Sequence, residues 1–133
     1  MSCKTIGRFV YDSATVTAVD AGGNIPFAST TATPDVLCDG ETITITKGGV
    51  YYVEFNATFV ATATGELETQ LYRNGNAVPG AHAYSTAVAD GDYVAQAYAT
   101  VITVPKCGQT AVNVRAIDAT EVTVANLIIT KAV

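Results

Sequence analysis

The sequence predicts an all-β protein that forms a single domain over residues 1–133, with antiparallel strands arranged as a sandwich or barrel. The first observation is the composition: the chain contains 20 Thr, 17 Val, 8 Ile, 7 Tyr and 4 Phe residues. Branched and aromatic side chains suit a pleated sheet and lose rotamer freedom in a helix. The second is a series of short segments separated by turn residues, and the third is that no segment has the apolar period of a helix.

Turn motifs such as DAGGN, CDGE, KGG, RNGN, ADGD and PKCGQ divide the chain at short intervals. The segments between them are predicted as strands, in chain order: about 5–11, 14–19, 25–30, 42–46, 50–61, 66–73, 77–84, 93–104, 110–117 and 122–131. Residues 1–24 are the part predicted least well, as N-terminal strands or an arm. Short strands at such spacing are typical of a β-sandwich.

The segment GVYYVEFNATF at residues 49–59 has the clearest alternation. Apolar side chains occupy every second position: Tyr51, Val53, Phe55, Ala57 and Phe59. The positions between them are mostly polar, which predicts a long strand with one face in the core.

The next predicted element is a hairpin. Asn74-Gly75 lies between two alternating runs and is predicted as a type I′ turn, because both central residues of that turn need a positive φ. In the strand before it, Leu67, Thr69 and Leu71 share one face, and Glu66, Glu68, Gln70 and Tyr72 share the other.

The last predicted strand is apolar on both faces. Val122, Val124 and Ile128 have one parity, and Ala125, Leu127 and Ile129 have the other. A strand of a two-sheet sandwich is covered on one face only, so a second cover is expected. The low charged fraction of 14% points the same way, and we expect a neighbouring subunit to supply that cover.

The net charge of −5 argues against a nucleic-acid partner, since the seven Lys and Arg residues are scattered. No apolar run has the length of a signal peptide or a membrane span, so we expect synthesis in the cytoplasm and no membrane partner. Cys3, Cys38 and Cys107 are expected to be free thiols. Strand directions place Cys38 and Cys107 at opposite ends of the sandwich, which excludes a bridge between them, while the pairing of Cys3 stays open.

Candidate sites for chemistry are weak. His82, Ser85 and Asp90 lack the sequence context of a hydrolase triad, and we expect His82 to be a loop residue. The acidic turns at 39–41 and 90–92 could hold calcium, but the full calcium-loop pattern is absent and Asp-Gly is an ordinary turn dipeptide. We therefore predict no enzyme activity, no catalytic residue, no cofactor and no metal.

Four motifs occur in a characteristic order: ITITKGGVYYVEFNATF at 43–59, LYRNGNAVPG at 71–80, AYATVITVPKCGQTAVNVRA at 97–116 and TVANLIITKAV at 123–133. In this order they resemble the TNF-like jelly roll found in the globular heads of complement and in their bacterial and phage relatives. The resemblance covers about residues 25–133. It implies a two-sheet antiparallel jelly-roll sandwich that forms a homotrimer. Complement heads follow a collagen stalk, whereas no Gly-X-Y run precedes the matched part of this chain.

The resemblance also implies that two polar strands face the trimer axis. Together with the two-sided last strand, this predicts the following trimer-interface residues: Glu68, Gln70, Tyr72, Asn113, Arg115 and Leu127. In this arrangement Arg115 pairs with a glutamate of a neighbouring subunit. The alternative is that the polar side chains form a plain solvated face.

Three functions are compatible with this sequence. The one we predict is a non-enzymatic structural protein, a trimeric decoration or head-fibre component of a phage virion that is made in the host cytoplasm and binds other virion proteins such as the capsid. The second is a trimer domain on a bacterial cell or spore surface. The third is a carbohydrate- or receptor-binding module in which Tyr84, Tyr93 and Tyr98 stack against a sugar.

Overall fold

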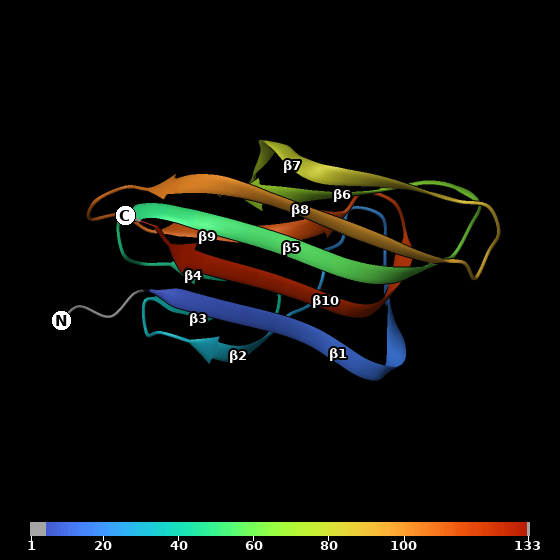
Figure 1. Cartoon of the computed structure of the whole chain (residues 1–133), viewed down its shortest axis with the longest axis horizontal. Coiled ribbons are helices and arrows are strands. Elements are labelled where there is room, and N and C mark those ends of the chain that lie inside the picture. The colour runs from blue at the N-terminus through green and yellow to red at the C-terminus, as the bar shows by residue number, and fades with distance from the viewer. Residues whose placement is uncertain (1–4, 133) are drawn as a thin grey trace.

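The computed structural model describes residues 5–132 as a sandwich of two five-stranded antiparallel sheets (Figure 1). Sheet A has the strand order β2-β1-β10-β5-β8, and sheet B has the order β3-β4-β9-β6-β7. In chain order the strands are β1 Ile6–Val19, β2 Ala28–Ala32, β3 Val36–Cys38, β4 Ile43–Ile45, β5 Gly49–Ala61, β6 Gly65–Arg73, β7 Asn76–Ala87, β8 Tyr93–Val104, β9 Thr110–Ala116 and β10 Thr120–Lys131. The predicted all-β jelly roll is therefore confirmed. The described part contains no helix, and hence none that could cross a membrane.

The strands predicted after residue 42 are confirmed to within a few residues, whereas the first part of the chain differs. The predicted strands 5–11 and 14–19 are one strand, β1, whose pairing with β10 shifts register between Asp12 and Thr17. This irregularity breaks the alternation of side chains, which is why the sequence suggested two strands.

The predicted strand 25–30 begins later, as β2. Before it, the chain runs beside β9 of the other sheet, where the Ile25 N–H donates to the Val114 carbonyl at 2.8 Å. Pro26 follows and has no N–H to contribute to a ladder. The three-residue strand β3 was not predicted, because a strand of this length has no recognisable alternation.

The alternation at 49–59 is confirmed, since the five residues predicted to face inward are all buried in the core between the sheets. Phe55 is at its centre. Its ring meets Phe27 edge-on with a centroid distance of 6.4 Å, and it lies 5.1 Å from the ring of Tyr98. Aromatic pairs of this geometry contribute beyond the area that they bury.

The predicted facing of the last strand is wrong in one respect. A register shift between Val122 and Val124 inserts an extra residue into β10 relative to β5. Such a bulge reverses parity, so Val122 shares the core face with Leu127 and Ile129. Only Val124 and Ile128 remain as apolar residues on the outer face of β10, and both are partly exposed.

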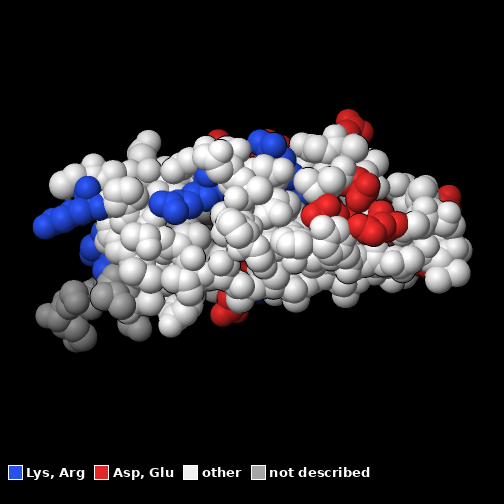
Figure 2. Space-filling view, turned by 90° about the horizontal axis from the view of Figure 1, so that it is seen from above, with Lys and Arg blue, Asp and Glu red and all other residues white. Residues whose placement is uncertain are grey.

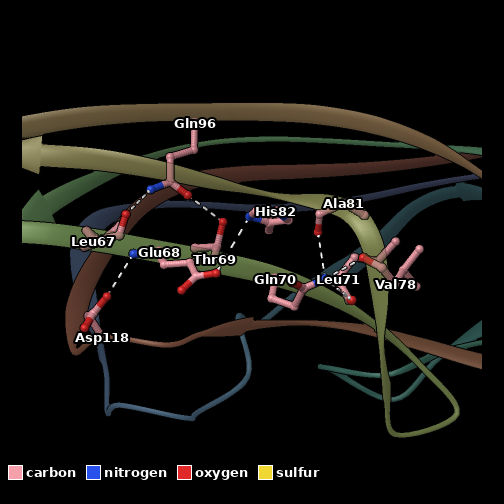
Figure 3. Close-up of polar contacts among 10 residues, drawn as sticks. All are labelled: Leu67, Glu68, Thr69, Gln70, Leu71, Val78, Ala81, His82, Gln96 and Asp118. Atoms are coloured by element: carbon pink, nitrogen blue, oxygen red, sulfur yellow. Dashed lines mark hydrogen bonds and ion pairs between the residues drawn. The ribbon is translucent and has the colours of Figure 1, made fainter.

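The predicted hairpin turn is confirmed, with φ values of 50° at Asn74 and 83° at Gly75. The pairing of β6 with β7 then shifts register between Gln70 and Tyr72. The Gln70 side chain lies against this irregularity, and its Nε2 donates to the carbonyls of Val78 and Ala81 at 2.8 and 3.1 Å (Figure 3). Gln70 is therefore mostly buried, although its parity predicted an outward-facing polar residue.

Hydrogen bonds inside the core also connect the two sheets (Figure 3). Gln96 of β8 reaches across to β6, where its Nε2 donates to the Leu67 carbonyl at 2.9 Å and its Oε1 accepts from the Thr69 hydroxyl at 2.5 Å. Gln96 and Thr69 are both buried. Because a buried polar group is costly without a partner, these bonds favour one position of β8 against β6.

Cys38 and Cys107 are free thiols, as predicted, and Cys3 lies outside the described residues. Their separation along the sandwich is smaller than strand counting implied. β4 has only three residues, so Cys38 pairs with Ile43 at the level of Val112, close to the start of β9.

Replacing Phe55 by Ala should lower the free energy of unfolding by about 3–5 kcal/mol, because it removes a buried aromatic ring and leaves a cavity. Denaturant unfolding at a fixed protein concentration measures the change. Tyr84→Ala is the control, since Tyr84 is more than half exposed and its loss should cost less than about 1 kcal/mol. Equal losses for the two variants would contradict the core position of Phe55.

Gln96→Leu should cost about 1–3 kcal/mol, because it leaves the buried Thr69 hydroxyl without its acceptor. Adding Thr69→Val removes the unpaired hydroxyl, so the double variant should be more stable than the sum of the two single changes predicts. Denaturant unfolding of the four proteins gives the coupling. If the losses of the two single variants add up to the loss of the double variant, the hydrogen bond between Thr69 and Gln96 does not contribute to stability.

Candidate subunit interface

The outer face of sheet A, called the sheet-A face below, carries half of the exposed large apolar side chains. Among residues 5–132, eight large apolar residues are exposed, and strand register places four of them on this face: Ile6, Tyr52, Tyr93 and Val101. Strand register explains part of this gathering, because Ile6, Thr130, Tyr52 and Val101 form one row across β1, β10, β5 and β8.

The centre of the sheet-A face combines an apolar residue with polar groups. In the next row, Ile128 of β10 lies between Arg8 of β1 and Glu54 of β5. Two strand spacings separate the two charged residues, a distance of about 10 Å. One row further, Asn126 Nδ2 donates to Asn56 Oδ1 at 3.2 Å. A partner would meet here an apolar side chain, two opposite charges and an amide pair.

The sheet-A face is hollowed beside its edge strand, β8. The hollow has a volume of about 300 Å³ and is lined by Glu54, Asn56, Ala97 and Ala99, together with atoms of the residues beneath them. The short side chains of Ala97 and Ala99 leave this space open, because they lie beside the longer Asn56 and Glu54 side chains of β5. A hollow next to exposed apolar residues can receive side chains from a second molecule.

The structure separates the interface residues that the sequence predicted. Five lie on the outer side of sheet B, on the neighbouring strands β6 and β9: Glu68, Gln70, Tyr72, Asn113 and Arg115. Leu127 belongs to sheet A and is fully buried between the sheets, so its prediction as an interface residue is wrong. The bulge in β10 is the physical reason, since it turns Leu127 inward. The interface role of the other five residues stays a prediction.

Each of these polar residues has contacts within its own chain. The Arg115 guanidinium lies 4.1 Å from the centre of the Tyr72 ring, a cation–π contact. Asn113 Nδ2 donates to Asn24 Oδ1 at 2.7 Å. Within the described chain Arg115 therefore rests on an aromatic ring, whereas the sequence predicted a glutamate of another subunit as its partner.

His82 lies in β7 rather than in a loop, so that prediction is wrong. Its Nδ1 is 3.7 Å from Glu68 Oε2, and its ring meets the Tyr84 ring edge-on. A hydrogen bond to the Glu68 carboxylate and the charge of that group raise the pKa of Tyr84. Ser85 donates to the Ala95 carbonyl at 3.3 Å, so His82 and Ser85 each have other partners.

The two acidic turns use carboxylates to hold their own backbone. Asp39 accepts from the N–H groups of Thr42 and Glu41, which lowers the pKa of the Asp39 carboxyl. Asp92 accepts from the N–H groups of Val88 and Ala89. Among residues 5–132, no three His, Cys, Asp or Glu side chains gather as metal ligands.

The three tyrosines considered for sugar stacking do not form one surface. Tyr98 faces the core against Phe55, and burial raises the pKa of its hydroxyl. Tyr84 is exposed on the outer side of sheet B, whereas Tyr93 is exposed at the start of β8 in sheet A.

The fold is that of several solved structures. Eiger TNF from S. frugiperda matches with a TM-score of 0.81 and 11% identity, over 98% of this chain and 93% of its own. Murine APRIL, solved at pH 5.0, has a TM-score of 0.74 and 11% identity over 98% and 100% of the two chains. The globular domain of zebrafish complement 1qA has a TM-score of 0.72 and 12% identity over 97% of each chain. No sequence-family model and no curated protein sequence matches the chain. The chain thus has the TNF-like, complement-head-like jelly roll that its motifs predicted.

Proposed function

We propose that the protein is a non-enzymatic structural module that assembles as a homotrimer through the sheet-A face. The observation that carries this proposal is the concentration of exposed apolar side chains on that face. The trimeric state is the one that the sequence resemblance implies. The TNF-like fold agrees with the trimer because the same resemblance implies both the fold and the trimeric state.

Burial of the apolar row gives a driving force for association. Ile6, Tyr52 and Val101 are about 40–50% exposed in the single chain. Complete burial of a large apolar side chain contributes about 1.5–3 kcal/mol, so each of these contributes on the order of 1 kcal/mol when a partner covers it. Because Arg8 and Glu54 flank the centre with opposite charges, they can pair with the opposite charges of a second copy.

The absence of enzyme activity is part of this proposal. The one histidine, His82, contacts Glu68 and Tyr84, and Ser85 is bonded to a backbone carbonyl on β8. This arrangement gives neither residue the nucleophile–base geometry of a hydrolase. The similarity to a TNF protein and a complement domain agrees with a binding or assembly role.

As the setting we propose a phage virion, in which the protein serves as a capsid decoration or head fibre. A bacterial cell or spore surface is the alternative. This proposal comes from the sequence. Genomic neighbours test it directly, because capsid and portal genes support a virion role, whereas sporulation or surface-protein genes favour the alternative.

Light scattering at micromolar concentration in 500 mM NaCl should give three times the chain mass of 13.8 kDa. Ala99→Glu should convert this species to monomers, because it places a charge in the hollow of the sheet-A face. Ala77→Glu is the matched control, since Ala77 is exposed on β7 of sheet B. A monomeric wild type, or an Ala99→Glu variant that stays trimeric, would contradict the proposal.

A further inference from the structure

Four of the six Lys and Arg residues among residues 5–132 lie at one end of the sandwich, called the basic end below, where Asp35 is the accompanying carboxylate. The four are Lys47 in the β4–β5 turn, Arg73 at the end of β6, Lys106 in the β8–β9 turn and Lys131 at the end of β10. These segments lie together. The backbone of Gly48 approaches the backbone of Lys106 closely, Arg73 Nη2 donates to the Thr103 carbonyl, and Ala132 N–H donates to the Val50 carbonyl.

The opposite end, called the acidic end, carries the following carboxylates: Asp20, Glu66, Asp90, Asp92, Asp118 and Glu121. Backbone hydrogen bonds also hold its loops together. Gly91 N–H donates to the Ala61 carbonyl, Gly22 N–H to the Ala116 carbonyl, and the Thr62 hydroxyl to the Ala119 carbonyl. No Lys or Arg occurs in the four connections at this end, at residues 20–27, 62–64, 88–92 and 117–119. Figure 2 shows this tendency, with most blue side chains toward one end of the molecule and the largest group of red ones toward the other.

This separation comes from side chains and not from the backbone, because strand dipoles in a sheet largely cancel. β5 runs between the two ends and has 13 residues. At about 3.3 Å per residue it spans on the order of 40 Å. The Debye length is only about 10 Å at 0.1 M salt, so the two ends do not screen or neutralise each other within one molecule. Each end is free to attract the opposite end of another molecule.

Both ends present their charges on ordered loops. At the basic end, the Tyr51 hydroxyl donates to the Lys47 carbonyl at 2.7 Å. At the acidic end, Asp92 Oδ2 accepts from Val88 and Ala89 N–H, and Asp118 Oδ2 accepts from Glu68 N–H at 2.9 Å. A contact between such loops loses less conformational entropy than a contact between mobile ones.

We propose that the basic end of one molecule binds the acidic end of a second copy, so that molecules stack end to end along the strand direction. Charge complementarity selects this occupant, because like ends repel and unlike ends attract. The contact joins two different surfaces of the same chain, and such a heterologous contact extends into a stack instead of closing into a dimer. Of its charged residues only Glu121, which lies in one row with Tyr93, is also on the sheet-A face, so the stacking does not depend on the proposed trimer.

Sedimentation velocity of the full chain at 20 mM and 500 mM NaCl tests the stacking. At 20 mM salt the wild type should form larger species with rising protein concentration. At 500 mM salt its apparent association should weaken at least about tenfold, because several exposed ion pairs are then screened. Lys47→Gln/Lys106→Gln and Glu66→Gln/Asp90→Asn should each lose association at low salt to a similar extent. All four of these side chains are exposed.

A matched control separates the basic end from net charge. Leu37→Glu/Tyr84→Glu makes the chain more negative by two charges, as Lys47→Gln/Lys106→Gln does, but at exposed positions on strands β3 and β7 of sheet B, away from the sheet-A face. This control should keep the low-salt association. The proposal is overturned if the wild type has the same size at both salt concentrations. It is also overturned if the lysine variant still associates at low salt, or if the control loses association to the same extent as the lysine variant. The size of every variant at 500 mM salt reports the sheet-A contact separately.

Discussion

The fold depends on the position of β10 between β1 and β5. β10 pairs with both neighbours along almost its whole length, so Ile6 lies beside Thr130 and Tyr51 beside Lys131. These contacts join the two ends of the chain and the middle of the sequence in one sheet. Bringing together segments so far apart in the sequence costs chain entropy. Burial of the apolar side chains of β10 and β5 that meet in the core offsets this cost. The sheet-A face is the opposite face of the same paired strands.

The bulge in β10 determines what each side of that sheet contains. Without the register shift between Val122 and Val124, residues of one parity would keep one face along the whole strand. With it, Val122 and Leu127 both reach the core, and Asn126 and Ile128 lie outside beside Asn56 and Glu54. One extra residue therefore completes the core and also creates the centre of the sheet-A face.

Local patterns in the sequence predicted the regular parts of the fold and missed the irregular ones. The alternation at 49–59 and the Asn74-Gly75 turn depend on the residues themselves and were predicted correctly. The bulge depends on how β10 meets β5 some sixty residues earlier, which no local pattern reports, and Leu127 was misplaced for this reason. The sheet-A face was missed because it consists of single apolar residues from four strands. Only the strand order in sheet A brings these residues together. The sequence contained one indication of this face, because the apolar Tyr52 stands among the polar, outward-facing positions of the 49–59 strand.

The sides and the ends of this sandwich are suited to different kinds of contact. The sheet-A face is mainly apolar, so a contact there gains from burial, acts at short range and is little affected by salt. The ends carry charges of opposite sign on turns, so a contact there acts over the Debye length and weakens as salt rises. A lateral apolar contact that closes into a ring uses up its surface, whereas an end-to-end contact leaves one free end at each stage. A jelly roll with an apolar sheet face and oppositely charged ends can therefore form assemblies of fixed width and variable length. The contact between sheet faces sets the width, and the contact between the turns at the ends sets the length.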